Sequence, residues 1–195
     1  MSKKAELLRA IAGQNRGLLT QELERVAILA AIAQLEDLNP TPKPTERPDL
    51  LDGDWRLLYT TSKELLGIDN VPLLQLGQIY QCIRTTTGAV YNFAEVEGVP
   101  WLEGLVCVSA KFEIVSERRL TVKFERSLIG LQRLFNYQSP AAMIQDLEAG
   151  DKKYLAVDLN LAERDRQGWV DLTYLDETLR INRGNEGSVF VLAKD

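Results

Sequence analysis

The sequence predicts a mainly β protein: an antiparallel β-barrel of about eight or nine strands, with N-terminal helices and one short helix in a late connection. Three observations support this fold class. The hydrophobic period is helical up to residue 39 and alternating after residue 50. A proline-rich segment separates the two regions, and short polar or glycine-bearing turns divide the second into strand-length pieces. The length of 195 residues suits one main domain.

Residues 1–39 form the predicted helical segment. Apolar residues recur at helical spacing from Ala5 to Ile11. A second run follows Thr20, which we expect to be its N-cap, and ends near Leu38. Residues 26–33 of this second helix are apolar on all sides. Such a helix is expected to pack on more than one side, and the alternative is a surface for a partner or a membrane.

Residues 40–49 are the predicted linker. The segment from Asn39 to Pro48 contains four prolines, which disfavour helix and sheet and favour an extended strap. An extended strap implies few contacts between the helices and the rest of the chain. We therefore expect a chain that begins near Thr45 to fold without the helices, with residues 50–195 as the barrel domain.

Nine segments after residue 50 show the alternation of β-strands. They are Trp55–Tyr59, Ile79–Ile83, Ala89–Phe93, Leu105–Ile114, Leu120–Leu128, Tyr154–Leu161, Gly168–Leu175, Leu179–Asn182 and Val189–Leu192. Ser139 followed by Pro140 predicts the start of a short helix that ends before Gly150. The apolar connections 65–76 and 128–135 are either lids over the barrel mouth or segments packed on its outside.

The composition argues against several classes of function. A net charge of −5 provides no basic field to attract nucleic acid. The chain has no histidine, which removes the usual general base, the Ser-His pair and the commonest metal ligand. Cys82 and Cys107 lack the spacing of metal or redox motifs and are expected to be buried free thiols. We therefore predict no catalytic residues, no metal site, no cofactor and no enzymatic activity.

Two long stretches carry a resemblance to a known family. Residues 52–55, Asp-Gly-Asp-Trp, contain the Gly-x-Trp pattern of lipocalins within the longer stretch 50–62, and the second stretch is 174–192. Both are similar to the signature ends of the plastid lipid-associated proteins, also called fibrillins, and shorter matches in the same order cover nearly the whole chain. The resemblance implies a lipocalin-like β-barrel whose ligands are carotenoids, prenylquinones or related lipids.

The candidate ligand-binding residues are aromatic side chains of the cavity or core and one arginine: Trp55, Tyr59, Tyr91, Phe93, Phe112, Phe124 and Arg183. Trp55 follows the turn at Gly53 and is expected to close one end of the barrel. Strand alternation places Arg183 on the apolar face of its strand and Arg180 on the opposite face. Because lipocalins place a basic residue against this indole, we expect Arg183 to lie beside Trp55 and Arg180 to matter less.

A structural motif is predicted around the last hairpin: Gly53, Trp55, Asp176, Arg180, Arg183, Gly184 and Gly187. Asp176 lies between two predicted strands, where its carboxylate is expected to accept backbone N–H bonds. The alternative is that Asp176 and Arg183 orient the polar head of a ligand. Residues 184–187 lack the lysine and the following helix of a phosphate loop, and therefore predict a hairpin turn.

The leading functional hypothesis is binding or carriage of a small apolar lipid at photosynthetic membranes or lipid bodies. The alternative is a structural or scaffolding protein of lipid bodies or thylakoids that binds a partner enzyme through its helices while the barrel is packed solid. No stretch is long enough to span a bilayer, so we expect a soluble or peripheral protein. The lack of a transit peptide points to the cytoplasm or thylakoid surface of a cyanobacterium, or to a processed plastid protein.

Overall fold

The computed structural model describes residues 2–62, 75–98, 101–150, 154–162 and 167–195. The helices and 3₁₀ turns are α1 (Lys3–Ile11), α2 (Glu22–Glu36), η1 (Pro44–Glu46), α3 (Pro48–Leu51), α5 (Gln132–Phe135), α6 (Pro140–Ala149) and η3 (Asn185–Gly187). The strands are β1 (Gly53–Thr60), β2 (Gln75–Arg84), β3 (Ala89–Glu97), β4 (Gly104–Ile114), β5 (Arg119–Leu131), β6 (Val157–Asn160), β7 (Gln167–Leu175), β8 (Leu179–Gly184) and β9 (Val189–Lys194). Each of the nine predicted strands is present.

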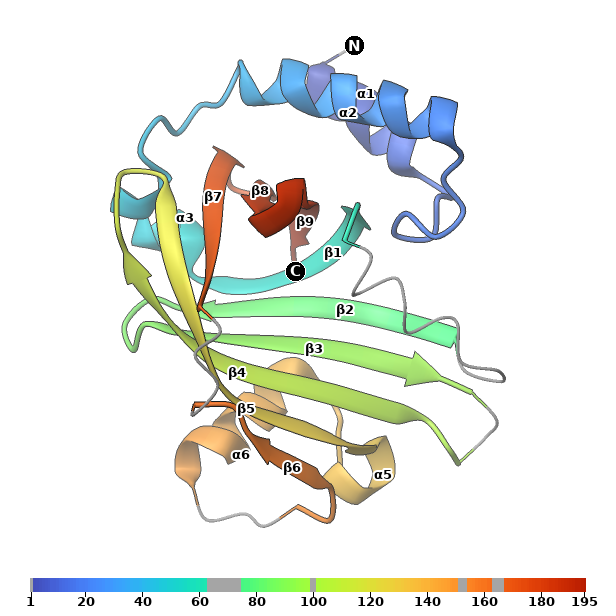
Figure 1. The fold of residues 1–195 in the computed structure, drawn as a ribbon, viewed down its shortest axis with the longest axis vertical. Coiled ribbons are helices and arrows are strands. Elements are labelled where there is room, and N and C mark those ends of the chain that lie inside the picture. The colour runs from blue at the N-terminus through green and yellow to red at the C-terminus, as the bar shows by residue number, and fades with distance from the viewer. Residues whose placement is uncertain (1, 63–74, 99–100, 151–153, 163–166) are drawn as a thin grey trace.

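Eight of these strands close into an antiparallel barrel (Figure 1). The order is β4-β3-β2-β1-β9-β8-β7-β5, and pairing of β4 with β5 completes the circle. The first part of β5 pairs with β7 and its later part with β6, which lies outside the barrel. The predicted short helix is α6, where the Ser139 hydroxyl accepts from the N–H of Ala142. The predicted fold class is thus confirmed.

Helices α1 and α2 cover one wall of the barrel (Figure 1). Their buried side chains, among them Leu7, Ile28 and Ile32, pack on outward-facing residues of β1, β7, β8 and β9. These outward-facing residues are Tyr59, Tyr174, Leu179, Ile181, Val189 and Val191. The expectation of few contacts across the proline segment is therefore wrong. The segment is also not extended throughout, since Pro44 begins η1 and Pro48 begins α3, where proline is tolerated in the first turn. The apolar faces of the helices, and not the proline segment, determine how much the helices contact the barrel.

Helix α2 has two different apolar faces. Ile28, Ile32 and Leu35 are buried against the barrel. On the outer face, Leu23 is 85% exposed and Val26 is 59% exposed. The helix N-cap is Gln21, one residue later than the predicted Thr20, and its backbone N–H donates to the Glu24 carboxylate. No helix in the described ranges combines the length and apolar character needed to cross a bilayer.

Helices α5 and α6 cover the opposite wall, outside β2 to β5 (Figure 1). Residues 128–131, predicted to lie in a connection, are the end of β5. In α5, Phe135 packs against Met143 and Ile144 of α6, so this connection lies on the outside of the barrel and is not a lid. The other candidate lid, residues 65–76, falls outside the described residues except for its last two positions.

Candidate functional site inside the barrel

Trp55 is buried inside the barrel next to α3. Its side chain has no exposed surface, and its indole N–H donates to the Leu51 carbonyl at 2.9 Å. The preceding turn uses Gly53 with φ +128°, and a Cβ there would lie 2.8 Å from the Lys194 Cε atom. Lys194 itself donates to the Leu50 carbonyl and lies 5.2 Å from the indole ring. The predicted role of Gly53 and the burial of Trp55 are both present.

The inner surface of the barrel is mostly apolar, but its side chains are not equally buried. Inward-facing Leu57, Ile83 and Leu192 are buried around Trp55. By contrast, four inward-facing side chains on β4 and β5 are only partly buried: Val106, Phe112, Val122 and Phe124. The predicted ligand residues Phe112 and Phe124 thus belong to the inner wall.

Three predicted cavity aromatics lie on the outer surface of the barrel instead. Tyr59 was expected to share a face with Trp55, but a β-bulge between Leu57 and Tyr59 reverses the alternation and turns Tyr59 toward the helices. Tyr91 and Phe93 lie beneath α5 and α6. Tyr59 and Phe93 are core residues of the two outer layers and Tyr91 packs against one of them, because helices cover both walls of this barrel.

The structure reverses the predicted roles of the two arginines. Arg180 faces inward, and its Cζ atom lies 4.7 Å from the centroid of the Trp55 ring. Arg183 faces outward, where its guanidinium forms a two-bond ion pair with Glu36 of α2 at 2.8 and 2.7 Å. The alternation itself was correct. The error was to equate the apolar face of β8 with the barrel interior, since that apolar face packs under the N-terminal helices.

Sequence reasoning missed a polar layer inside the barrel. Arg180 donates through Nη2 to the Gln81 side-chain oxygen, and the Gln81 amide donates to the Asn92 side-chain oxygen at 3.1 Å. The Asn182 amide is 3.5 Å from the same Gln81 oxygen. A signal was available for Gln81, which alternates with the inward-facing residues Ile79 and Ile83. Burial lowers the pKa of Arg180 to about 9, so the guanidinium stays charged at neutral pH.

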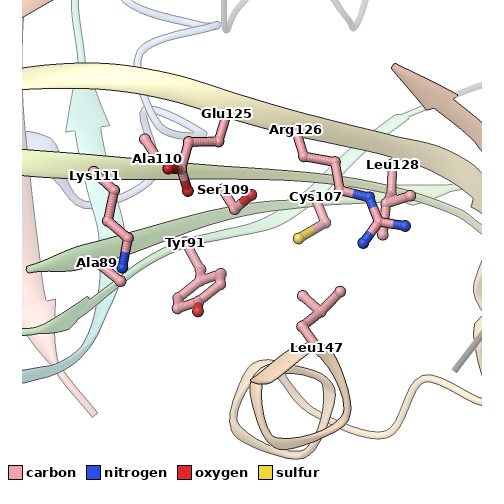
Figure 2. A pocket seen from close by; sticks show the side chains of 10 residues that line it. All are labelled: Ala89, Tyr91, Cys107, Ser109, Ala110, Lys111, Glu125, Arg126, Leu128 and Leu147. Atoms are coloured by element: carbon pink, nitrogen blue, oxygen red, sulfur yellow. The ribbon is translucent and has the colours of Figure 1, made fainter. Parts of the chain in front are cut away.

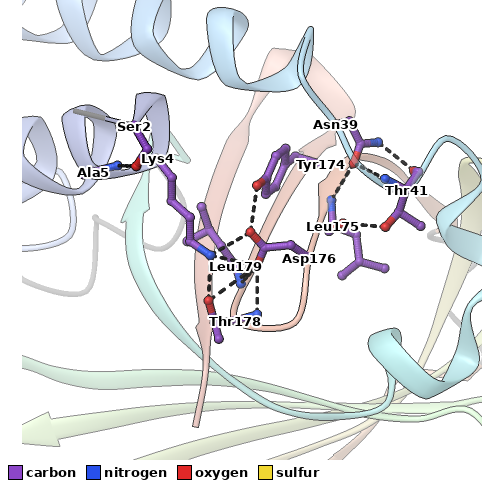
Figure 3. A network of polar contacts seen from close by, with 10 residues as sticks. All are labelled: Ser2, Lys4, Ala5, Asn39, Thr41, Tyr174, Leu175, Asp176, Thr178 and Leu179. Carbon is purple, nitrogen blue, oxygen red and sulfur yellow. Dashed lines mark hydrogen bonds and ion pairs between the residues drawn. The ribbon is translucent and has the colours of Figure 1, made fainter.

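Asp176 joins the first helix to the β7–β8 turn (Figure 3). Its carboxylate accepts from the backbone N–H groups of Thr178 and Leu179 at 2.8 and 2.7 Å, as the turn interpretation predicts. It also accepts from the Lys4 ammonium at 2.6 Å and from the Tyr174 hydroxyl at 2.7 Å. This network lies outside the barrel, so the structure does not bring Asp176 together with the inner polar layer. Gly184 precedes η3 and Gly187 is its last residue, in the predicted hairpin turn.

A groove of about 180 Å³ lies on the outer wall between β3, β4, β5 and α6 (Figure 2). Tyr91, Lys111, Glu125 and Arg126 give it mixed charge, and Cys107 lies at its floor. Burial raises the pKa of the Cys107 thiol to about 12, which disfavours the reactive thiolate. Both cysteines are free and buried, as predicted. In the part of the chain that the structure describes, no three potential ligand residues cluster as a metal site would require.

A closed antiparallel barrel of eight strands, with an inward-facing tryptophan hydrogen-bonded to the short helix before β1, defines a lipocalin-like barrel protein. The sequence profile of the PAP_fibrillin family matches residues 1–193, and the chain therefore belongs to this family of plastid lipid-associated proteins. No solved structure matches the chain.

Three of its relatives carry informative names. The chain is 33% identical to the light-induced protein, chloroplastic, of Solanum tuberosum, and 33% identical to a chromoplast-specific carotenoid-associated protein of Cucumis sativus. Each alignment covers 98% of this chain and 67% of the relative. Plastoglobulin-1 of Pisum sativum is 32% identical over 98% of this chain and 60% of its own length.

Proposed function

We propose that the barrel binds or carries a small apolar lipid, such as a carotenoid or prenylquinone, at a photosynthetic membrane or lipid body. The observation that carries this proposal is that the inward-facing apolar side chains of β4 and β5 are only partly buried. A barrel of eight strands is of the size that can hold one small ligand. The names of the carotenoid-associated protein and plastoglobulin-1 support a role in lipid association. The chloroplast and chromoplast labels of the relatives favour a plastid, with a cyanobacterial thylakoid as the other proposed location.

The test is fluorescence titration of a variant in which Trp55 is the only tryptophan, obtained through Trp101→Phe and Trp169→Phe. Trp55 is buried in the barrel, so a carotenoid or quinone bound inside should quench it saturably at a near-stoichiometric ratio. Val106→Phe adds bulk to the inner wall and should weaken binding, whereas Ile114→Phe, at a side chain that is 60% exposed, is the matched control. Quenching that does not saturate, or that is the same with and without Val106→Phe, would contradict the proposal.

A scaffolding role remains a second candidate because of the outer face of α2. Leu23, Val26, Ala27 and Ala30 recur at helical spacing and are all exposed. A partner enzyme or a lipid surface would bury this stripe without any ligand in the barrel. Val26→Glu should then abolish flotation with thylakoid-lipid vesicles or pull-down of a partner, while leaving the Trp55 titration unchanged. If Val26→Glu instead loses Trp55 quenching but still floats with the vesicles, the outer face of α2 does not mediate the surface association and the scaffolding role is contradicted.

A further inference from the structure

Arg180 is unusual because it is a charged side chain placed fully inside the barrel. Among the described residues, it is the only Lys, Arg, Asp or Glu that is buried, and it has no exposed surface. Its neighbour Lys194 is partly exposed and donates to a backbone carbonyl of α3. The interior therefore contains a cation that solvent does not reach.

The partners of Arg180 leave part of its guanidinium unsatisfied. One face lies over the Trp55 ring, and Nη2 donates to Gln81. The Nε and Nη1 atoms of Arg180 have no hydrogen-bond acceptor, and the side-chain oxygen of Asn182 has no donor. In the described ranges no carboxylate forms an ion pair with Arg180.

Without a further acceptor, such an arrangement is costly. A buried charge is normally paired, and a buried N–H without an acceptor costs about 1–3 kcal/mol. The stacking on Trp55 offsets part of the charge but satisfies none of the N–H groups, because those point along the edge of the guanidinium plane. A bound group that brings both an acceptor oxygen and a negative charge would remove both deficits.

We propose that the barrel binds a single-chain amphiphile whose carboxylate accepts hydrogen bonds from Arg180, with its hydrocarbon chain along the partly buried apolar side chains of β4 and β5. This inference rests on the proposed lipid-binding function and specifies the head group. A carboxylate matches the single positive charge of Arg180, whereas a phosphate monoester would leave excess negative charge inside. Gln81 and Asn92 are inward-facing and only partly buried, and hydrogen bonds link them to the buried guanidinium.

The experiment compares three ligands with the same twelve-carbon chain length, laurate, methyl laurate and 1-dodecanol, by calorimetric titration of the full chain. Laurate should bind about tenfold more tightly than either neutral ligand, as one charge-assisted contact provides. Arg180→Met should remove this preference, because it should weaken laurate binding about tenfold more than methyl laurate binding. Arg183→Met is the matched control, because this arginine lies on the same strand but pairs with Glu36 outside the barrel.

A measurement on the unmodified protein guards against misfolding of Arg180→Met. In a ¹³C-carboxyl laurate titration, the bound head group should have a lower pKa than free laurate, because Arg180 favours the ionised form. Equal affinity for the three ligands, or a bound carboxyl that titrates like free laurate, would overturn the inference.

A decyl-substituted benzoquinone in the same titration separates this result from the proposed function. Quinone binding without laurate preference overturns the carboxylate site alone and leaves lipid binding intact. If neither the quinone nor any of the three twelve-carbon ligands binds, both proposals fall.

Discussion

Removal of the N-terminal helices should abolish cooperative folding of the barrel. A chain of residues 39–195 loses α1 and α2 and exposes the six outward-facing side chains that they cover on β1, β7, β8 and β9. Burial of an apolar side chain of this size is worth about 1.5–3 kcal/mol, so the total is on the order of 10 kcal/mol. This total is an upper estimate of the lost free energy of unfolding, and it is comparable to the whole stability of a typical domain, about 5–15 kcal/mol. The ion pairs of Arg183 with Glu36 and of Asp176 with Lys4 disappear as well.

The assay is urea denaturation of the fragment and the full chain, followed by tryptophan fluorescence and far-UV circular dichroism. Two variants of α2 provide a graded test on the intact chain. Ile32→Ala, at a position with no exposed surface, should cost about 2–5 kcal/mol, whereas Val26→Ala should stay within about 0.5 kcal/mol. A fragment that unfolds in one cooperative transition at the midpoint of the full chain would refute the reasoning.

Three further predictions concern single residues. Trp55→Ala should lower the free energy of unfolding by about 3–5 kcal/mol with or without ligand, and a loss below about 1 kcal/mol would argue against close packing around this indole. Burial alone raises the pKa of Asp176, but hydrogen bonds from Lys4 and Tyr174 outweigh it and the net shift is downward from 3.8. Its stabilisation is therefore present above pH 3.8 and lost as the pH falls through the lowered pKa, so Asp176→Asn should cost about 1–3 kcal/mol at pH 7 and little at pH 2. Denaturation midpoints at both pH values check this, and an equal loss at each would contradict it. Cys82 and Cys107 should react with a thiol reagent only after unfolding, because burial raises the pKa of both thiols; rapid labelling of the native protein would show that they are accessible.

Periodicity was sufficient to predict the fold because each strand alternates and the turns between strands are polar. The same periodicity did not show which face of a strand lies inside. In most small barrels only the interior is apolar, but here helices also bury two outer walls. An apolar strand face therefore does not show whether that face points into the barrel or toward the helices. Arg183 was placed inside for that reason, and Arg180, opposite it, is the inward residue.

Local irregularity explains the other error in the predicted site. The bulge after Leu57 inserts one residue into β1, and the residue types in that stretch do not predict it. Tyr59 therefore points outward although simple alternation from Trp55 places it inside. The polar layer was missed for a different reason: Gln81 and Asn92 are polar residue types that usually face solvent, although each shares a strand face with inward-facing apolar residues.

The outer strand β6 has a consequence for how the molecule behaves in concentrated solution. In the described part of the chain β6 pairs with β5 on one side and with no strand on the other, so it presents a free edge where a strand from a second chain can add. Val157 and Leu159 on this strand are exposed, which favours such association. Two features oppose it: the strand has only four residues, and Asp158 carries charge in a 2.7 Å ion pair with Arg126. Resistance to aggregation thus depends on a very short stretch of sequence.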